Sequence, residues 1–370
     1  MAEVQARAGY LGLLGRRWRC GAGGNRARQH GPGEHRAASS VRRRRSRGSR
    51  RAVARTEFAL PWPGGSRCRR GGRGEVILVT GGTGFVGGHV VRALRADDRP
   101  VRCLVRDRRK AGDLAELGCE LVEGDITDPA SLRRAGAGAD VVVHLVAIRQ
   151  GKPEQFQRIM VGGTRDLLKL AKEGGAKRWV HMSALGTSEA TKDLVPYFGA
   201  KWQMEQDVQR SGFPYVIFRP SFVFGRDGGI LPTFRKLGKL APVTPIIGSG
   251  EQRIQAIWAD DVAAYFAKAI DLEAATNRTF ELGGPDVVTW NEFWERLKRA
   301  LGIRRPSVHV PVGLMKVNAL VTERLPGNIP LTRDLLKMLE SGDNVVTNDE
   351  AVQTFQLSLV PLDEQLRRAV

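Results

Sequence analysis

A tyrosine and a lysine, Tyr197 and Lys201, stand four residues apart in the stretch Pro196-Tyr-Phe-Gly-Ala-Lys. On a helix this spacing places both side chains on one face. A free phenol has a pKa of about 10, which is too high for easy proton exchange at neutral pH, but a neighbouring ammonium stabilises the phenolate. The pair is a candidate for general acid–base chemistry at a carbonyl or hydroxyl carbon, with Tyr197 exchanging the proton. Such pairs also occur by chance on exposed helix faces, so the surrounding elements decide the meaning of this one.

A glycine-rich stretch, residues 75–88, lies upstream of this pair. Val76 to Val79 form a run of apolar β-formers that predicts a buried parallel strand, and apolar residues recur at helical spacing after the glycines. A strand, a glycine turn and a helix in this order are the context of a dinucleotide-binding fingerprint. An ordinary strand–helix turn with incidental glycines is the alternative.

Three glycines of this turn have separate roles in the fingerprint. Gly81 allows a sharp turn, Gly84 removes a side chain where a diphosphate must approach the backbone, and Gly87 lets the helix pack closely on the strand. The helix N-terminus presents free N–H groups and the positive end of its dipole to the phosphates. The sequence therefore predicts a nucleotide site, with Thr83, Phe85 and Val86 completing the loop.

The residues that follow the next strand bear on the choice of nucleotide. Residues 101–105 are predicted to form that strand, and Arg106 stands where NAD-selective folds place an acid for the ribose 2′-hydroxyl. A guanidinium suits a 2′-phosphate, so NADP(H) is favoured. Asp107 keeps NAD(H) possible, and a solvated basic loop is the plain alternative.

Further strands and helices alternate along the chain, which predicts an α/β fold with a Rossmann-type doubly wound parallel sheet. Such a sheet holds its ligand at the carboxyl ends of its strands. Asp125 could accept a hydrogen bond from an adenine amino group or serve only as a turn residue. The complete set predicted to bind the cofactor is Gly81, Thr83, Gly84, Phe85, Val86, Gly87, Arg106, Asp125, Ile126, Ala147, Lys201 and Pro220.

The alternation predicts where the domains divide. Residues 75–225 are expected to form the nucleotide-binding domain. Residues 226–370 are expected to form mainly a smaller mixed lobe for substrate or partner, with some elements returning to the sheet. The lobe is apolar around residues 308–321, which hints at a lipid or quinone-like partner, although packing on the sheet explains this equally well.

The basic character of the chain belongs to its first 74 residues. The formal net charge is +20, and residues 1–74 contain 19 Arg, no Lys and 3 Glu, which leaves +4 for the remainder. This tail is too poor in apolar residues to fold alone and is expected to be disordered. It is a misassigned start, a transit peptide, or an arm for nucleic acid or anionic lipid. Location would be mitochondrial or plastid with a transit peptide, and cytoplasmic in a bacterium.

Two other classes of protein receive little support. Stacking aromatics are sparse in the tail, and the remainder is nearly neutral, so no nucleic-acid partner is predicted for the folded part. We find no apolar run of about 18 residues, so no transmembrane helix is expected. The four cysteines show no paired metal-ligand spacing, and no metal site is predicted.

These motifs resemble the short-chain dehydrogenase/reductase superfamily in its extended or atypical branch, which includes NAD-dependent epimerases and dehydratases. Within it, the chain is similar to relatives of the dehydrogenase-like accessory subunit of respiratory complex I, through residues 181–186 and 330–339. The resemblance covers about residues 75–365 and implies a Rossmann fold, NAD(P)H binding and possible hydride transfer. The matching segments are residues 80–87, 124–125, 197–201, 219–221 and 260–262.

The chain departs from the superfamily's active-site pattern at two positions. Met160 replaces an asparagine, and a thioether cannot hold a relay water as an amide does. The substrate-binding serine or threonine is expected to fall on Ala184 by strand register. Ser183, one residue earlier, would then serve only if the strand end bulged, and Thr187 and Ser188 are alternatives.

Two functions follow from this comparison. The first is an NADP-dependent oxidoreductase or epimerase-type enzyme acting on a carbonyl or secondary alcohol, with Tyr197, Lys201 and Ser183 as catalytic residues. The second is a non-catalytic NAD(P)H-binding accessory subunit or redox sensor in a respiratory or quinone-linked assembly.

Overall fold

The structure is a computed structural model that describes residues 75–316 and 332–370. The predicted Arg-rich tail, residues 1–74, lies outside the described residues, as does the start of the 330–339 motif.

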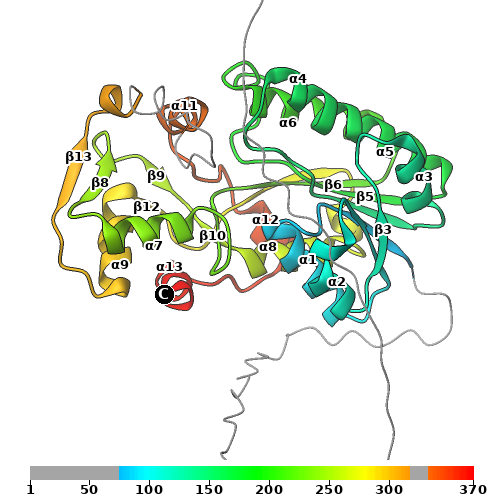
Figure 1. The fold of residues 1–370 in the computed structure, drawn as a ribbon, viewed down its shortest axis with the longest axis horizontal. Coiled ribbons are helices and arrows are strands. Elements are labelled where there is room, and N and C mark those ends of the chain that lie inside the picture. The colour runs from blue at the N-terminus through cyan, green and yellow to red at the C-terminus, as the bar shows by residue number, and fades with distance from the viewer. Residues whose placement is uncertain (1–74, 317–331) are drawn as a thin grey trace, which may run out of the picture. The chain divides into compact units, whose positions relative to one another are not determined.

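A seven-stranded sheet forms the centre of the fold (Figure 1). Its strand order is β11-β6-β5-β4-β1-β2-β3, and every neighbouring pair is parallel. The order reverses between β1 and β4, which is where a doubly wound sheet opens a crevice for its ligand. The predicted Rossmann-type fold is confirmed. The strands are β1 (Ile77–Thr80), β2 (Val101–Val105), β3 (Glu120–Glu123), β4 (Val141–His144), β5 (Arg178–Met182), β6 (Tyr215–Pro220) and β11 (Arg278–Leu282).

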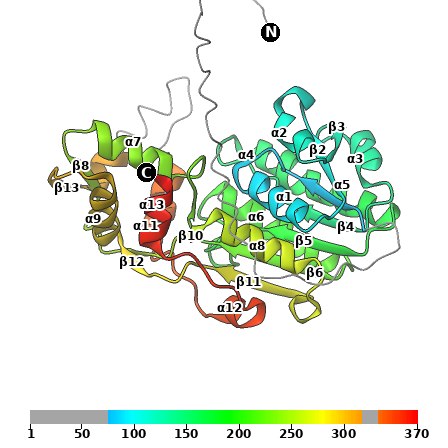
Figure 2. The ribbon, with the colours of Figure 1, turned by 90° about the horizontal axis from the view of Figure 1, so that it is seen from below.

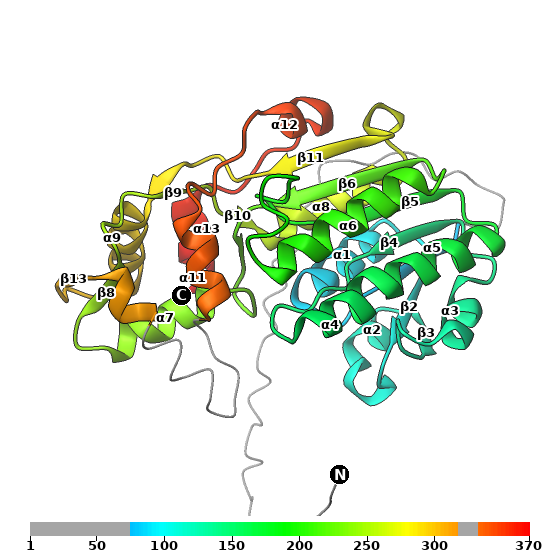
Figure 3. The ribbon, with the colours of Figure 1, turned by 90° about the horizontal axis from the view of Figure 1, so that it is seen from above.

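Helices cover both faces of this sheet because its strands are apolar on both sides. In β1, Ile77 and Val79 belong to a core shared with α1 (Phe85–Ala96) and α8 (Ala259–Ala269), two helices labelled beside the sheet in Figure 2. Leu78 faces the opposite core, formed with α3 (Pro129–Gly136), α5 (Gly163–Glu173) and α6 (Pro196–Arg210), as Figure 3 shows.

Shorter helical segments connect these elements. One of them, η2, is a π-helix that includes Met160 and runs directly into α5. The segments are η1 (Arg108–Lys110), α2 (Gly112–Glu116), α4 (Pro153–Gln155), η2 (Phe156–Gly162), η3 (Glu273–Ala275) and α12 (Glu350–Phe355).

A smaller lobe gathers short strands and helices around a second apolar core, in which Phe224, Phe293 and Trp294 are buried. Its strand pairs are β7–β10, β9–β12 and β8–β13, and Thr289 caps α9 in a capping box with Glu292. The elements are β7 (Val223–Phe224), α7 (Leu231–Leu240), β8 (Thr244–Ile247), β9 (Arg253–Ile254), β10 (Ile257–Trp258), β12 (Val288–Thr289), α9 (Trp290–Leu301), β13 (Ser307–Val310), α11 (Arg333–Glu340) and α13 (Leu362–Ala369).

Several elements after residue 225 belong to the sheet rather than to this lobe. α8 packs against α1, β11 forms one edge of the sheet, and Phe355 of α12 contacts Phe218 and Phe280. Among the described helices, none combines the length and apolar character needed to cross a bilayer.

Candidate nucleotide-binding and active site

The glycine turn between β1 and α1 is built by close backbone contacts. Gly81 has φ +83°, which favours glycine. A β-carbon on Gly81 would lie 3.0 Å from the carbonyl carbon of Leu145, just beyond β4. A β-carbon on Gly87 would lie 2.1 Å from the Gly81 carbonyl oxygen. The turn therefore lies against the end of β4, at the switch point of the sheet.

The same turn fits a diphosphate. Gly84 is exposed, and a β-carbon on it would meet only the Gly81 carbonyl oxygen, at 3.2 Å, so the space above the loop is open. Gly84 is the N-cap of α1 and has no side chain to satisfy the first N–H groups of the helix. These N–H groups and the helix dipole are suited to an anionic group. Thr83 is exposed beside Gly84.

Arg106 and Asp107 follow β2 in different environments. Arg106 is exposed and, within residues 75–316 and 332–370, has no hydrogen-bonding or ion-pair partner. The Asp107 Oδ1 atom accepts hydrogen bonds from the backbone N–H and the Nε–H of Arg109, both at 3.0 Å. The Arg109 side-chain bond lowers the pKa of Asp107. The carboxylate that could hold a ribose hydroxyl is thus engaged, while the guanidinium is not.

Asp125 lies near Arg106 at the end of β3. Its Oδ1 atom accepts hydrogen bonds from the Thr127 backbone N–H at 2.9 Å and the Thr127 hydroxyl at 2.6 Å. The Thr127 side chain is the main cause of its lowered pKa, and the charge of Arg106 contributes. Asp125 therefore acts as a turn residue, and these bonds leave its Oδ2 atom for a further donor.

The other predicted cofactor residues have the following positions. The Ile126 side chain is buried, and a β-carbon on Gly163 would lie 2.7 Å from its Cγ1 atom, so it packs on the start of α5. Pro220 is buried at the end of β6, and its carbonyl oxygen accepts from the Leu185 N–H at 2.9 Å. Ala147 is half-buried beyond the end of β4.

Tyr197 and Lys201 lie in the first turns of α6. Tyr197 packs in one side-chain cluster with Ala147 and Met160, which brings the phenol close to the carboxyl end of β4. Burial raises its pKa to about 12, although the charge of Arg149 opposes this. Among the described residues the Tyr197 hydroxyl has no hydrogen-bond partner.

Lys201 is fully buried with its ammonium group 5.9 Å from the centre of the Tyr197 ring. The Nζ atom donates a hydrogen bond to the Met182 carbonyl oxygen at 2.6 Å. Burial lowers its pKa to about 8, against the opposing charge of Glu205. At neutral pH the lysine is therefore still mainly charged, and the tyrosine is protonated.

The end of β5 does not bulge at Ser183. The Ser183 N–H donates to Phe218 at 2.7 Å and the Leu185 N–H donates to Pro220 at 2.9 Å, so the ladder continues without a bulge. Trp179 belongs to the core beneath α6, and alternation places Ser183 on that same face. Ser183 thus reaches the α6 face without a bulge, and Ala184 points the other way. The Ser183 hydroxyl is buried and has no hydrogen-bond partner within the described chain.

Thr187 and His181, like Ser183, have buried polar atoms without hydrogen-bond partners. The Thr187 hydroxyl and both ring nitrogens of His181 are buried without partners in the described part of the protein. Burial, the charge of Lys201 and the neighbouring His144 lower the pKa of His181 well below its ordinary range, so the ring is neutral. Sequence reasoning did not select His181, because an apolar strand gives no signal for a histidine without partners.

Two side-chain contacts, one of Phe85 and one of Arg219, were also not predicted from the sequence. Phe85 packs under the loop that follows β7, where β-carbons on Gly225 and Gly228 would lie 2.6 and 2.1 Å from its ring. Arg219 pairs through two hydrogen bonds, of 2.9 and 2.5 Å, with the fully buried Glu205 carboxylate of α6. The glycine spacing of residues 225–229 was a usable signal for the first feature. No local pattern indicates the second.

The fold and the open glycine turn define a protein of the NAD(P)-binding Rossmann class. The model of the NAD dependent epimerase/dehydratase family matches residues 77–283, which is more than half of the chain. The chain belongs to this family, and the resemblance to the extended branch is confirmed.

Individual relatives show the range of the family. The chain is 29% identical over 249 residues to an NAD(P)H azoreductase of Xenophilus azovorans, covering 67% of this chain and 80% of the relative. It is 31% identical over 321 residues to the mitochondrial NADH dehydrogenase (ubiquinone) 1 alpha subcomplex subunit 9 of Rattus norvegicus, covering 81% and 82%. The structure of Citrobacter sp. triphenylmethane reductase complexed with NADP(H) has the same fold, with a TM-score of 0.65, 22% identity and coverage of 80% and 100%.

Proposed function

We propose that this protein is an NADP(H)-dependent oxidoreductase or epimerase-type enzyme acting on a carbonyl or secondary alcohol. The observation that carries the proposal is that Tyr197 and Ala147 pack against the same buried cluster, which includes Met160. It holds a proton-donating side chain beside the crevice where the sheet order reverses.

The protonation states favour the direction of carbonyl reduction. Bound NADPH supplies a hydride with its electron pair to the carbonyl carbon. Tyr197, whose pKa is raised by burial, is protonated at neutral pH and donates its proton to the carbonyl oxygen. Ser183 and Thr187 have buried hydroxyl groups without partners, and we assign to Ser183 the positioning of that oxygen. Lys201 remains charged at neutral pH and holds the ribose hydroxyls.

The choice of NADPH rests on Arg106. Its exposed guanidinium has no acidic partner in the described residues, whereas Asp107 is occupied by Arg109. A 2′-phosphate is the group that a free guanidinium at this place binds well.

The test compares the full-length protein with its Tyr197→Phe variant. We expect NADPH consumption with a panel of quinones, azo compounds and ketones. The variant should lose at least about a hundredfold in kcat while its NADPH Kd stays within twofold. Equal turnover by the two proteins would remove Tyr197 from the mechanism, and no NADPH binding by a folded wild type would refute the whole proposal.

One observation favours a second candidate, a non-catalytic NAD(P)H-binding accessory subunit or redox sensor of a respiratory or quinone-linked assembly. Met160 is fully buried in the Tyr197 cluster, where the superfamily carries asparagine, and the Lys201 ammonium bonds to Met182 rather than to the phenol. A mitochondrial complex I subunit is among the relatives. NADPH binding without turnover, together with co-migration in a large native complex, would support this candidate. Migration as a free monomer or dimer would contradict it.

A transit peptide, one of the three interpretations of residues 1–74, fits the same candidate, since it would deliver the protein to an organelle. Import of the full-length chain, followed by removal of a segment within residues 1–74, would support it. Retention of these residues on the mature protein would contradict it.

A further inference from the structure

We propose that the smaller lobe carries a docking surface for an anionic phospholipid membrane, formed where α7 and α9 end. This inference is independent of the proposed reaction, because it uses no residue of the nucleotide site.

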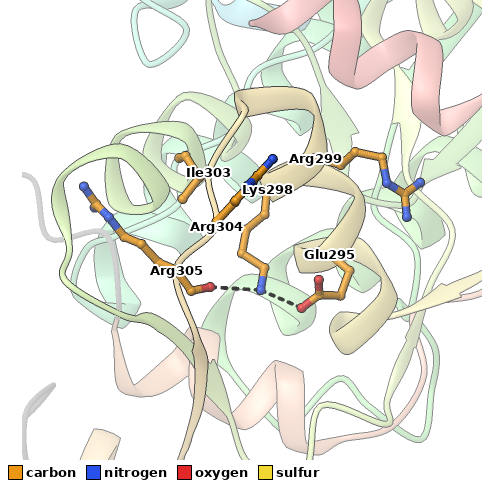
Figure 4. A pocket seen from close by; sticks show the side chains of 6 residues that line it. All are labelled: Glu295, Lys298, Arg299, Ile303, Arg304 and Arg305. Atoms are coloured by element: carbon orange, nitrogen blue, oxygen red, sulfur yellow. Dashed lines mark hydrogen bonds and ion pairs between the residues drawn. The ribbon is translucent and has the colours of Figure 1, made fainter.

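The surface is built around a shallow hollow of about 310 Å³, shown in Figure 4. Four of its six lining side chains are cationic and only one is acidic. The lining residues are Glu295, Lys298, Arg299, Ile303, Arg304 and Arg305.

The acid in the hollow is already neutralised. The Lys298 ammonium lies 2.6 Å from Glu295 and also donates to the Arg305 carbonyl oxygen at 3.2 Å (Figure 4). Lys298 and Glu295 therefore cancel each other, and the net charge of the hollow comes from the three arginines.

Arg305 joins this hollow to the end of α7. Its guanidinium donates to the carbonyl oxygens of Lys239, at 2.9 Å, and Ala241. The charge compensates the negative end of the helix dipole and brings Lys239 and Leu240 beside the hollow.

Four cations at this place have no partner. The side chains of Lys236, Lys239, Arg299 and Arg304 are exposed, and across residues 75–316 and 332–370 none of them forms a hydrogen bond or ion pair. Their positive charge is not balanced locally, so it is directed to solvent.

Positive charge is concentrated in the two segments of the chain that form this surface. Residues 231–245 carry three cations and no acid, and residues 295–310 carry five cations and one acid, which gives +7 for the two segments. The whole of residues 75–370 carries only +4, so everything outside these segments is net negative. The positive surface is therefore a local feature of this lobe.

An exposed apolar side chain ends α7, directly after Lys239. Leu240 is 70% exposed, the most exposed large hydrophobic residue of the described chain, and Val308 on neighbouring β13 is 43% exposed. Cations that bind lipid phosphates around a leucine that enters the acyl boundary are typical of a membrane-surface site.

Other macromolecules fit less well. A stable protein interface needs a broader apolar centre than one leucine and one valine. Single-stranded nucleic acid is held by stacking on exposed aromatic rings, and no Trp, Tyr or Phe is among the exposed large hydrophobics of the described residues.

The test uses the full-length protein and vesicles of phosphatidylglycerol and phosphatidylcholine in a 3:7 ratio. A patch variant carries Lys236→Gln, Lys239→Gln, Arg299→Gln and Arg304→Gln. A matched control carries Arg133→Gln, Lys169→Gln, Lys172→Gln and Arg210→Gln, four exposed cations on α3, α5 and α6. We expect the patch variant to bind at least about tenfold more weakly than the wild type and the control to bind normally. Equal binding by the patch variant, or equal losses in both, would overturn the proposal.

Because residues 1–74 are Arg-rich and would also attract anionic vesicles, a readout local to the patch is needed. Leu240→Cys, labelled with a polarity-sensitive dye in a Cys20→Ser, Cys68→Ser background, reports on the patch alone, since Cys103 and Cys119 are buried. We expect a blue shift with anionic vesicles and none for a label at Lys169→Cys. The proposal fails if the Leu240→Cys label does not respond, responds equally to pure phosphatidylcholine, or responds equally to single-stranded DNA.

Discussion

Gly87, in the first turns of α1, lies so close to Gly81 that a β-carbon on Gly87 would stand 2.1 Å from the Gly81 carbonyl oxygen. Real β-carbons do not approach a carbonyl oxygen this closely, so the helix must move if any other residue is present. Gly84 differs, because its β-carbon would be 3.2 Å from that same oxygen and otherwise faces open space. Two glycines of one motif thus serve separate purposes, the packing of a helix and the approach of a ligand.

Alanine substitutions at Gly87 and Gly84 test helix packing and ligand approach separately. Gly87→Ala is expected to lower the free energy of unfolding by about 1–3 kcal/mol, because backbone must shift, and to abolish NADPH binding. Gly84→Ala should unfold like the wild type yet bind NADPH at least about tenfold more weakly, since its methyl group occupies the phosphate side of the loop. Thermal unfolding and titration calorimetry measure the two effects. Gly112→Ala is the control, as nothing lies within 4 Å of its β-carbon. Unchanged NADPH affinity in Gly84→Ala would contradict a diphosphate at this loop.

The preference for NADPH is testable at Arg106. Arg106→Ala removes a charge-assisted contact with the 2′-phosphate, so NADPH affinity should fall about tenfold to a hundredfold while NADH affinity changes little. Arg109→Ala removes the two side-chain hydrogen bonds that the guanidinium donates to the Asp107 carboxylate and should improve NADH binding. Fluorescence titration with both nucleotides distinguishes these outcomes. An equal loss for NADPH and NADH in Arg106→Ala would show that the arginine does not read the 2′-phosphate.

Local patterns were sufficient for the sheet and the nucleotide turn. The apolar run of β1 is followed directly by Gly81 and Gly87, and each signal lies within a few residues of the structure it predicts. The capping box of Thr289 and Glu292 at the start of α9 is another structure whose signal is local. Parallel strands with intervening helices leave few alternative arrangements, so the class of fold followed as well.

Features that depend on distant parts of the chain were not predictable. The face on which Ser183 lies depends on the hydrogen bonds from the end of β5 to Phe218 and Pro220, which the sequence alone does not show. The π-helix that contains Met160 has an ordinary helical sequence. The pairing of Glu205 with Arg219 joins a helix to a strand, and only tertiary packing shows it.

The buried Lys201 predicts a pH dependence. Burial lowers its pKa from 10.5 to about 8, so between these values the unfolded chain holds the proton and the folded chain releases it. The free energy of unfolding should therefore rise by roughly 1–3 kcal/mol from pH 8 to pH 10.5 through this group. NADPH affinity should fall over the same range as the ammonium is lost.

The comparison with Lys201→Met isolates this contribution from other titrating groups. Denaturant unfolding at pH 7.5, 9 and 10.5 measures the free energy of unfolding of both proteins. As pH rises, the value for the wild type should increase relative to the value for Lys201→Met. NADPH affinity of the variant should be weak and flat with pH. A difference that stays constant with pH would show that folding does not lower the pKa of Lys201.

Asp261, in the first turn of α8, should make the free energy of unfolding fall as pH rises, which is opposite to the effect of Lys201. Desolvation raises its pKa to about 6, although its Oδ2 atom accepts the Val360 N–H at 2.9 Å. Between pH 3.8 and 6 the folded state holds the proton that the unfolded chain releases, so this group lowers stability as pH rises through that range. Asn retains an acceptor for Val360 and carries no charge. Asp261→Asn should therefore raise the free energy of unfolding by about 1–3 kcal/mol at pH 7 and by little at pH 4. Thermal melts of both proteins at the two pH values measure this, with Asp113→Asn on the exposed side of α2 as the control. Destabilisation of Asp261→Asn at pH 7 would mean that the charged carboxylate stabilises the fold.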